Sequence, residues 1–193
     1  MKGPRWPKQR SVDWETRPAL FECLLRTKLL PKKFIASGKL WDPFYCRGSV
    51  AKVYAELGLT VRHQNENFWD VWEKVLEPET FLFTNPPFGK GMAFWLKAFF
   101  NFVVTFDRPF LLILPNYICT RSYFGVMFSK ILRPHELHIW GLNKSFPMLK
   151  LGAKDATNFT GLTIAAYYPT KWNFVLDKDQ FKYVFLKTHI HLK

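Results

Sequence analysis

Short apolar runs alternate with amphipathic segments along this chain, and the alternation predicts strands and helices in turn. The runs at 81–83 and 109–114 are continuously apolar and lead into prolines, which is typical of buried strands in a parallel sheet. Apolar residues recur at helical spacing over 19–25 and 92–106, so each of these segments predicts a helix with one buried face.

The rest of the pattern completes the series. Thr16 is placed to cap the helix over 19–25, and Pro18 fits its first turn. A strand begins at Lys39, and a helix over 51–57 ends at Gly58. The other predicted elements are a strand from 61, helices at 69–76 and 120–132, strands at 80–84, 135–140 and 161–168, a polar loop over 142–160 and one or two edge strands within 171–193.

This alternation, with a rim loop after each strand, predicts a doubly wound α/β fold around a mostly parallel sheet. At 193 residues the chain has room for one well-buried domain, which we place at 13–170. A basic N-terminal arm at 1–12 precedes it. A C-terminal extension at 171–193 is expected to contact the domain or a partner.

The net charge of the chain predicts a polyanionic partner. The chain has 28 Lys and Arg against 15 Asp and Glu, a formal net charge of +13. No apolar run approaches the roughly 18 residues of a membrane-spanning helix, so nucleic acid is preferred to a membrane. The alternative is a solvated basic surface that only keeps the protein soluble.

Cysteine and histidine spacing exclude other classes of site. The three cysteines lack C-x-x-C spacing, which fits a reducing intracellular compartment and argues against a zinc knuckle. His135 and His138 would lie on opposite faces of a strand, and no third ligand stands near His189 and His191, so no metal site is predicted. The basic arm also permits a mitochondrial address.

The loop 85–88, Asn-Pro-Pro-Phe, carries the first candidate chemistry. Asn85 offers an amide carbonyl, and Phe88 offers a flat ring on which a base can stack. Groups of this kind hold the exocyclic amine of an extruded nucleobase. A plain proline-rich turn is the alternative.

This loop resembles the signature Asp/Asn/Ser-Pro-Pro-aromatic of amino-methyltransferases that use S-adenosylmethionine, most of which act on adenine N6. The resemblance implies that Asn85 and the Pro86 carbonyl hold the target amine and that Phe88 stacks on the base. Pro87 belongs to the same catalytic motif. In this chemistry, positioning of the amine toward the sulfonium methyl supplies most of the acceleration.

A second motif, Asp42-Pro43-Phe44-x-x-x-Gly48, lies between the strand at Lys39 and the next helix. A tight loop with a glycine before a helix lets backbone amides approach a ligand closely. The motif is similar to the first cofactor motif of these methyltransferases. The match implies that Asp42, Pro43, Phe44 and Gly48 cradle the methionine part of S-adenosylmethionine.

A nearer resemblance is to a eukaryotic microbial group of predicted N6-adenine methyltransferase-like proteins. Four motifs occur in the same order over about Asp13 to Trp140. They stand here at 42–48, 61–68, 85–88 and 111–117. The lead Trp14-Glu15-Thr16-x-Pro18 is also similar to the opening of phage-type adenine methyltransferases. Together these resemblances imply the class I methyltransferase type of fold.

Three departures from that group bear on cofactor binding: Arg47, Gln64 and Asn67 replace acids. An acid after the second strand of such a sheet accepts hydrogen bonds from ribose hydroxyls. Gln64 accepts through one neutral oxygen, and Glu66 on the same strand face would have to substitute. Without it, losing the charged acceptor would cost about 1.5–3 kcal/mol.

Candidate nucleic-acid contacts lie on the neighbouring loops. Lys90 follows the catalytic loop, Asn116 and Tyr117 close the strand at 109–114 on the same rim, and Arg121 begins the next helix. Plain solvation is the alternative for each cation. Gly89-Lys90-Gly91 is not a phosphate loop, because the G-x-x-x-x-G-K spacing is absent.

Two classes of function follow. The first is methyl transfer from S-adenosylmethionine to adenine N6 in nucleic acid, with RNA favoured because no separate target-recognition domain is visible. The second is an inactive methyltransferase-like subunit or assembly factor of an RNA–protein complex, favoured by Arg47, Gln64 and Asn67. A glutamine-directed protein methyltransferase shares the Asn-Pro-Pro motif, but the positive charge makes it the least favoured.

Overall fold

The computed structural model describes residues 14–45, 48–68, 70–71, 80–86, 96–97, 99–100, 106–128, 137–142, 145–150, 154–155, 157–159, 161–169 and 185–187. The basic arm at 1–12 and most of the helices predicted at 69–76 and 92–106 lie outside these residues. Most of the extension at 171–193 lies outside them as well.

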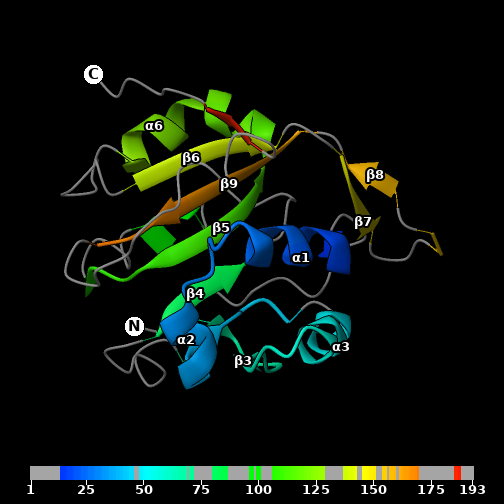
Figure 1. The fold of residues 1–193 in the computed structure, drawn as a ribbon. Coiled ribbons are helices and arrows are strands. Elements are labelled where there is room, and N and C mark those ends of the chain that lie inside the picture. The colour runs from blue at the N-terminus through cyan, green and yellow to red at the C-terminus, as the bar shows by residue number, and fades with distance from the viewer. Residues whose placement is uncertain are drawn as a thin grey trace.

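The elements follow the predicted order with few exceptions (Figure 1). The helices are α1 (Pro18–Arg26), α2 (Lys32–Ser37), α3 (Ser49–Glu56), the 3₁₀ helix η1 (Asn116–Thr120) and α6 (Ser122–Phe128). The strands are β1 (Trp14–Thr16), β2 (Leu40–Trp41), β3 (Val61–Arg62), β4 (Phe81–Thr84), β5 (Phe110–Pro115), β6 (Leu137–Leu142), β7 (Phe146–Lys150), β8 (Thr157–Phe159), β9 (Leu162–Tyr167) and β10 (Phe185–Lys187).

A seven-stranded sheet forms the centre, in the order β10-β6-β9-β5-β4-β2-β3. Strands β3, β2, β4 and β5 are parallel to one another, whereas β9 is antiparallel to both β5 and β6. Strand β6 therefore runs in the same direction as β5. Strand β10 pairs antiparallel with β6 at the edge. The prediction of an α/β fold around a mostly parallel sheet is confirmed.

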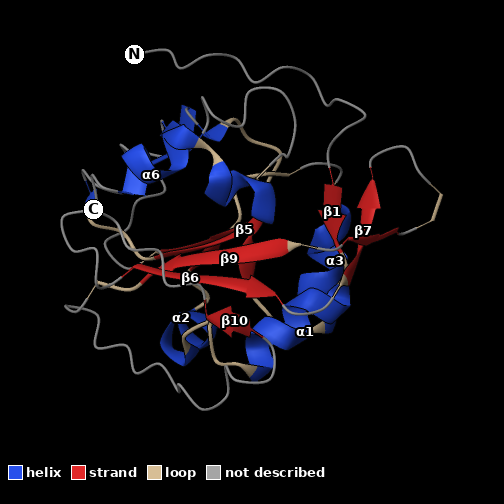
Figure 2. Ribbon diagram, turned by 90° about the horizontal axis from the view of Figure 1, so that it is seen from above, coloured by secondary structure: helices blue, strands red, loops and turns tan. Residues whose placement is uncertain are grey.

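Both faces of the sheet are buried at β4 and β5, which explains why the runs at 81–83 and 110–114 are continuously apolar. Phe83 and Ile113 lie in the core cluster that also contains residues of α1, α2 and α3. Leu82 and Leu112 lie in the other cluster, together with Phe124 of α6. Figure 2 shows these helices on opposite sides of the sheet. The two clusters follow from the two-residue period of a strand.

The chain reverses its direction of travel across the sheet at β2. After β2 it passes through α3 to β3 on one side, and it then returns to place β4 on the other side of β2. Ligands of open α/β sheets bind outside the carboxyl ends of the strands at such a switch point. The residues that follow β2 and β4 are therefore those to inspect.

A second sheet of three strands has the order β1-β7-β8. The prediction of a polar loop over 142–160 was wrong, because β7 and β8 lie within it. Pro147 and the polar residues of this stretch hid the strand pattern, and the pairing of β7 with β1 is a tertiary effect. Thr16 belongs to β1 and does not cap α1, whose N-cap is Arg17 without a side-chain cap bond.

Two other features complete the outline. The helix predicted over 120–132 corresponds to α6, which begins at Ser122, and the extended residue Arg121 separates it from η1. Among the described helices, none combines the length and the apolar character needed to cross a bilayer.

Truncation of the central strand tests this core. Ile113 in β5 is fully buried, so Ile113→Ala should lower the free energy of unfolding by about 2–5 kcal/mol, because a cavity remains. The control Val126→Ala changes a residue that is 60% exposed and should stay within about 0.5 kcal/mol of wild type. Urea denaturation measures both, and equal midpoints for the two variants would contradict the core assignment.

Candidate active site

The carboxylate of Asp42 joins four segments at the switch point. Asp42 follows β2 and is only 4% exposed. Its Oδ1 accepts hydrogen bonds from Thr84 Oγ1 at 2.5 Å and from the Phe44 backbone N–H at 3.2 Å. Its Oδ2 accepts from Tyr54 Oη at 2.8 Å and lies 3.2 Å from His63 Nδ1. These contacts use the acceptor capacity of a carboxylate and fix β4, α3 and the residue after β3 to β2.

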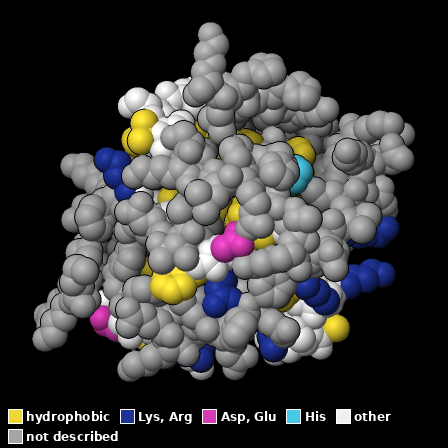
Figure 3. Space-filling model, turned by 90° about the vertical axis from the view of Figure 1, so that its left-hand side faces the viewer, with side chains coloured by type: hydrophobic (Ala, Val, Ile, Leu, Met, Phe, Trp, Pro, Cys, Tyr) yellow, Lys and Arg dark blue, Asp and Glu magenta, His cyan; other side chains and the backbone are white. Residues whose placement is uncertain are grey.

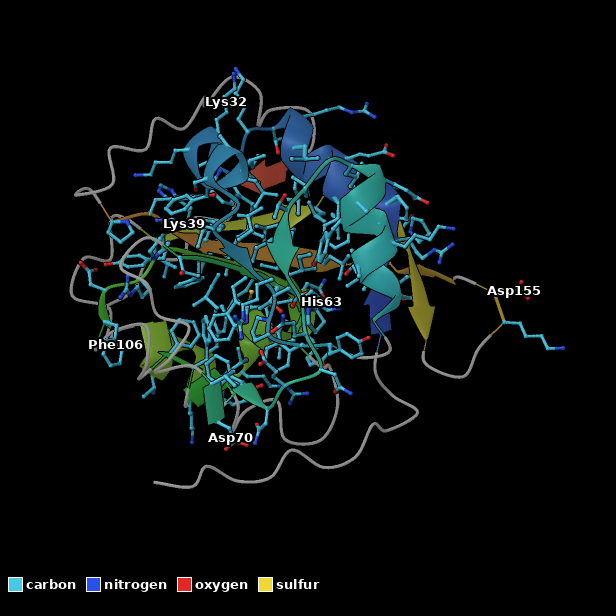
Figure 4. The ribbon with its side chains drawn as sticks, turned by 90° about the horizontal axis from the view of Figure 1, so that it is seen from below. Lys32, Lys39, His63, Asp70, Phe106 and Asp155 are labelled. Atoms are coloured by element: carbon cyan, nitrogen blue, oxygen red, sulfur yellow. The ribbon has the colours of Figure 1, made fainter. Side chains whose placement is uncertain are left out.

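His63 is the buried partner of Asp42. Its side chain is 2% exposed and lies within the molecule (Figure 4). The Tyr45 ring stacks on the imidazole, with centroids 5.1 Å apart, and Tyr54 meets it edge-on. Burial acts to lower the pKa of His63, but the hydrogen bond and charge of Asp42 outweigh burial, and the pKa is raised. Nε2 is buried and has no hydrogen-bond partner among the described residues.

Asn85 lies at the same edge as Asp42, because it follows Thr84 directly. Its Nδ2 donates to Thr16 Oγ1 at 2.9 Å, so the first strand of the second sheet holds the amide. Pro86 is buried beside it. The structure thus brings the Asp42 loop and the Asn85 loop together, as predicted for parallel strands. Three of the predicted residues, Pro87, Phe88 and Lys90, lie outside the described residues.

Gly48 stands where its motif requires a glycine. It is the N-cap of α3, with φ of +75°, and its N–H donates to the Tyr45 carbonyl at 2.7 Å. A Cβ at this position would overlap the hydroxyl and ring of Tyr45. The backbone therefore offers the close approach that a cofactor cradle needs. The Tyr45 ring covers that approach in this structure.

The predicted ribose contacts follow β3. Gln64 and Glu66 are exposed, and the Glu66 N–H donates to the Gln64 carbonyl at 2.8 Å. The Glu66 carboxylate forms an ion pair with Arg62 at 2.8 Å. Asn67 Nδ2 donates to Asp70 Oδ2 at 3.0 Å. A ribose at Glu66 would share the carboxylate with Arg62. Arg47 lies outside the described residues, whereas Pro43 is buried and Phe44 partly buried beside Asp42.

The three residues predicted after β5 gather on η1 and its end. The Asn116 N–H donates to the Gly161 carbonyl at 2.6 Å, and its side chain lies against Gly161, which has φ of +79°. Tyr117 is 41% exposed, and the Arg121 guanidinium lies 5.6 Å from its ring centre. Partial burial raises the pKa of Tyr117 despite the opposing charge of Arg121, so the phenol is neutral at physiological pH.

Sequence reasoning overlooked several residues at this edge. The first three are Thr16, Thr84 and His63, and the others are the two tyrosines Tyr45 and Tyr54. A polar residue at the carboxyl end of a parallel strand, such as Thr84 in β4 or His63 after β3, is the signal that would have found two of them. No group of three His, Cys, Asp or Glu that could hold a metal occurs in the described part of the chain.

Comparison with known proteins adds no assignment to this geometry. No family model, curated protein or solved structure matches the chain. The interpretation of the site therefore depends on its own residues and on the motifs that they form.

The Asp42–His63 pair predicts a pH-dependent stability. Because the pKa of His63 is raised above its ordinary value, folding favours the protonated ring. The resulting stabilisation is present below about pH 6.5 and is lost as the pH rises through the raised pKa. The free energy of unfolding of wild type relative to His63→Gln should therefore be largest below about pH 6.5 and should fall as the pH rises through the raised pKa of the ring.

Urea denaturation at several pH values measures this difference. In the Asp42→Asn background this fall should be lost or change sign, since burial, which lowers the pKa of His63, then acts without the opposing charge of Asp42. An NMR titration in which the His63 ring of wild type titrates at or below its ordinary pKa would contradict the assignment.

Proposed function

We propose that the protein transfers a methyl group from S-adenosylmethionine to adenine N6 in nucleic acid, with RNA as the favoured substrate. The observation that carries the proposal is the meeting of the Asp42 and Asn85 loops at the switch point, joined by the Thr84–Asp42 hydrogen bond. One loop resembles a cofactor cradle and the other a target-amine clamp. Their adjacency is what group transfer between two ligands requires.

The donor side would be formed by the loop from Asp42 to Gly48. When bound, S-adenosylmethionine supplies an electrophilic methyl group. Gly48 gives a ligand access to the backbone at the start of α3, and the buried His63 Nε2 is a polar atom without a partner in the described part of the chain. Asp42 has its acceptors occupied by protein donors, so its role is to hold Phe44 and Thr84 in place.

On the acceptor side, Asn85 and the Pro86 carbonyl would accept the two N–H groups of the adenine amine. Hydrogen bonds of this kind draw the nitrogen lone pair out of conjugation and aim it at the methyl group. Thr16 stabilises Asn85 from the second sheet, so the amide needs little reorganisation when substrate arrives.

The sheet and the charge support the same proposal. The fold is compatible with the proposal, because the parallel strands β3, β2, β4 and β5 contain the switch point at which open α/β sheets bind ligands. The net charge of +13 favours a polyanionic substrate. On the face shown in Figure 3, described Lys and Arg side chains lie mostly over the lower half, with few acids among them.

A second candidate is a methyltransferase-like subunit that binds RNA within an RNA–protein complex and has lost catalysis. Two observations favour it: the Tyr45 ring covers Gly48, and Arg62 engages the carboxylate of Glu66. Both would reduce affinity for an adenosyl ligand. A glutamine-directed protein methyltransferase is a weaker alternative, because its substrate does not call for the positive charge.

Calorimetric titration with S-adenosylmethionine separates the candidates. Wild type should bind at micromolar concentration, and Gly48→Ala should weaken binding by about tenfold or more, because the added Cβ would occupy the approach to the backbone that the glycine leaves open. The control Gly58→Ala carries the same backbone strain, with φ of +67°, in open space after α3, and should bind as wild type does. Tyr45→Ala should retain or tighten binding. If neither wild type nor Tyr45→Ala shows a binding signal at millimolar S-adenosylmethionine, the inactive subunit is favoured.

Methyl transfer to an adenine-containing RNA tests the acceptor side. Asn85→Ala should lower the rate by about a hundredfold or more while leaving the affinity for S-adenosylmethionine within a factor of two. The control Thr60→Ala alters an exposed residue before β3, at the amino ends of the parallel strands, and should keep the wild-type rate. Transfer that survives unchanged in Asn85→Ala would exclude the proposed role of this loop.

A further inference from the structure

Tyr117 is an exposed aromatic residue near the carboxyl ends of the parallel strands, where the candidate active site lies. Among the described residues the exposed large hydrophobic side chains are Phe106, Tyr117 and Val126. Tyr117 is the one that comes shortly after a parallel strand, β5, with only Asn116 between them, so it lies at the carboxyl ends of the parallel strands. Phe106 precedes the same strand and lies toward the opposite edge, at the left in Figure 4.

The position of Tyr117 relative to Asn85 follows from the strand register. Thr84 pairs with Leu112, and β5 continues to Pro115 before η1 begins. Three residues of extended chain place η1 roughly 10 Å beyond the end of β4, one strand to the side. A nucleotide next to the target adenine in an extended strand can reach this distance.

The turn that presents Tyr117 is rigid. The Asn116 N–H and side chain hold Gly161, and Ile118 is fully buried. Thr120 Oγ1 donates to the Tyr117 carbonyl at 2.8 Å, and the Arg121 N–H donates to the Ile118 carbonyl at 3.0 Å. Because the backbone is already ordered, a ligand that binds the ring loses little entropy to the protein.

The chemistry of the pair matches an unpaired nucleotide. Arg121 lies within cation–π distance of the Tyr117 ring, and both side chains are exposed. Aromatic rings at protein surfaces bind single strands by stacking on bases, and nearby arginines bind the phosphates. A base inside a duplex has its faces covered by neighbours, so a ring at a rim can stack only on an unstacked base.

We infer that Tyr117 and Arg121 form a subsite that binds the nucleotide next to the target adenine in single-stranded RNA. The base stacks on Tyr117, and Arg121 contacts the adjoining phosphate. The inference deepens the proposed function and rests on it for the place of the target adenine. It makes an unpaired strand, and not a duplex, the substrate.

Fluorescence anisotropy with a labelled nine-nucleotide RNA, one adenine flanked by uridines, tests the subsite without S-adenosylmethionine. Tyr117→Ala should weaken binding by about tenfold, and Tyr117→Phe should stay within a factor of two. Phe106→Ala, an equally exposed aromatic at the opposite edge (38% against 41%), should bind as wild type does. Arg121→Ala should lower the salt dependence by about 0.7 in the log–log slope, whereas Tyr117→Ala should not.

An RNA with an abasic nucleotide beside the adenine locates the contact. Wild type should lose affinity for it by the same factor as Tyr117→Ala loses for intact RNA, and Tyr117→Ala should lose nothing more. If the abasic position is instead the adenine itself, Tyr117→Ala should still weaken binding of that RNA by the same factor, so the loss from the variant and the loss from the missing adenine should multiply. No binding by wild type, equal affinity of Tyr117→Ala and wild type, or tighter binding of a duplex would overturn the inference.

The outcome is distinguishable from failure of the proposed function. RNA binding that depends on Tyr117, together with no methyl transfer, retains the stacking contact and rejects the enzyme. Methyl transfer that Tyr117→Ala leaves unchanged in rate and in KM for RNA retains the enzyme and rejects the subsite.

Discussion

The burial of one carboxylate is the constraint on which this structure depends. A charged group removed from water is costly unless hydrogen bonds replace its hydration, and Asp42 meets that demand with donors from four separate places in the chain. Each donor must be delivered by its own backbone segment. The hydrogen bonds that the buried Asp42 carboxylate requires therefore fix the relative positions of β2, β4, α3 and the end of β3. They also fix the two loops of the candidate site.

The same arrangement explains the tension between the two candidate functions. Tyr45 stacks on His63, and His63 is held by Asp42, so the ring that covers Gly48 belongs to the network that orders the edge. A ligand that reached Gly48 would exchange a tyrosine face for its own contacts without dismantling Asp42. The proposed function therefore requires the Tyr45 ring to leave Gly48 accessible to a ligand, whereas the alternative does not.

The central sheet and both loops could be predicted because their information is local. A continuous apolar run such as Leu111–Leu114 permits few structures besides a strand buried on both faces, and parallel strands must end at one edge. The second sheet could not be predicted in this way. Its strand β7 contains Pro147 and depends on β1, a partner from the other end of the domain. His63 was overlooked for a similar reason, since its role is created by Asp42.

The pairing of β1 with β7 has a consequence for how the molecule is made. Trp14 pairs with Lys150, so β1 can pair only after β7 has been synthesised. Contacts between segments so far apart in the chain form slowly. Because Thr16 lies in β1 and accepts a hydrogen bond from Asn85, the Asn85 amide gains this hydrogen bond only when β1 is in place. The order of the Asn85 amide is therefore coupled to closure of the second sheet, which joins segments of the chain that are more than a hundred residues apart.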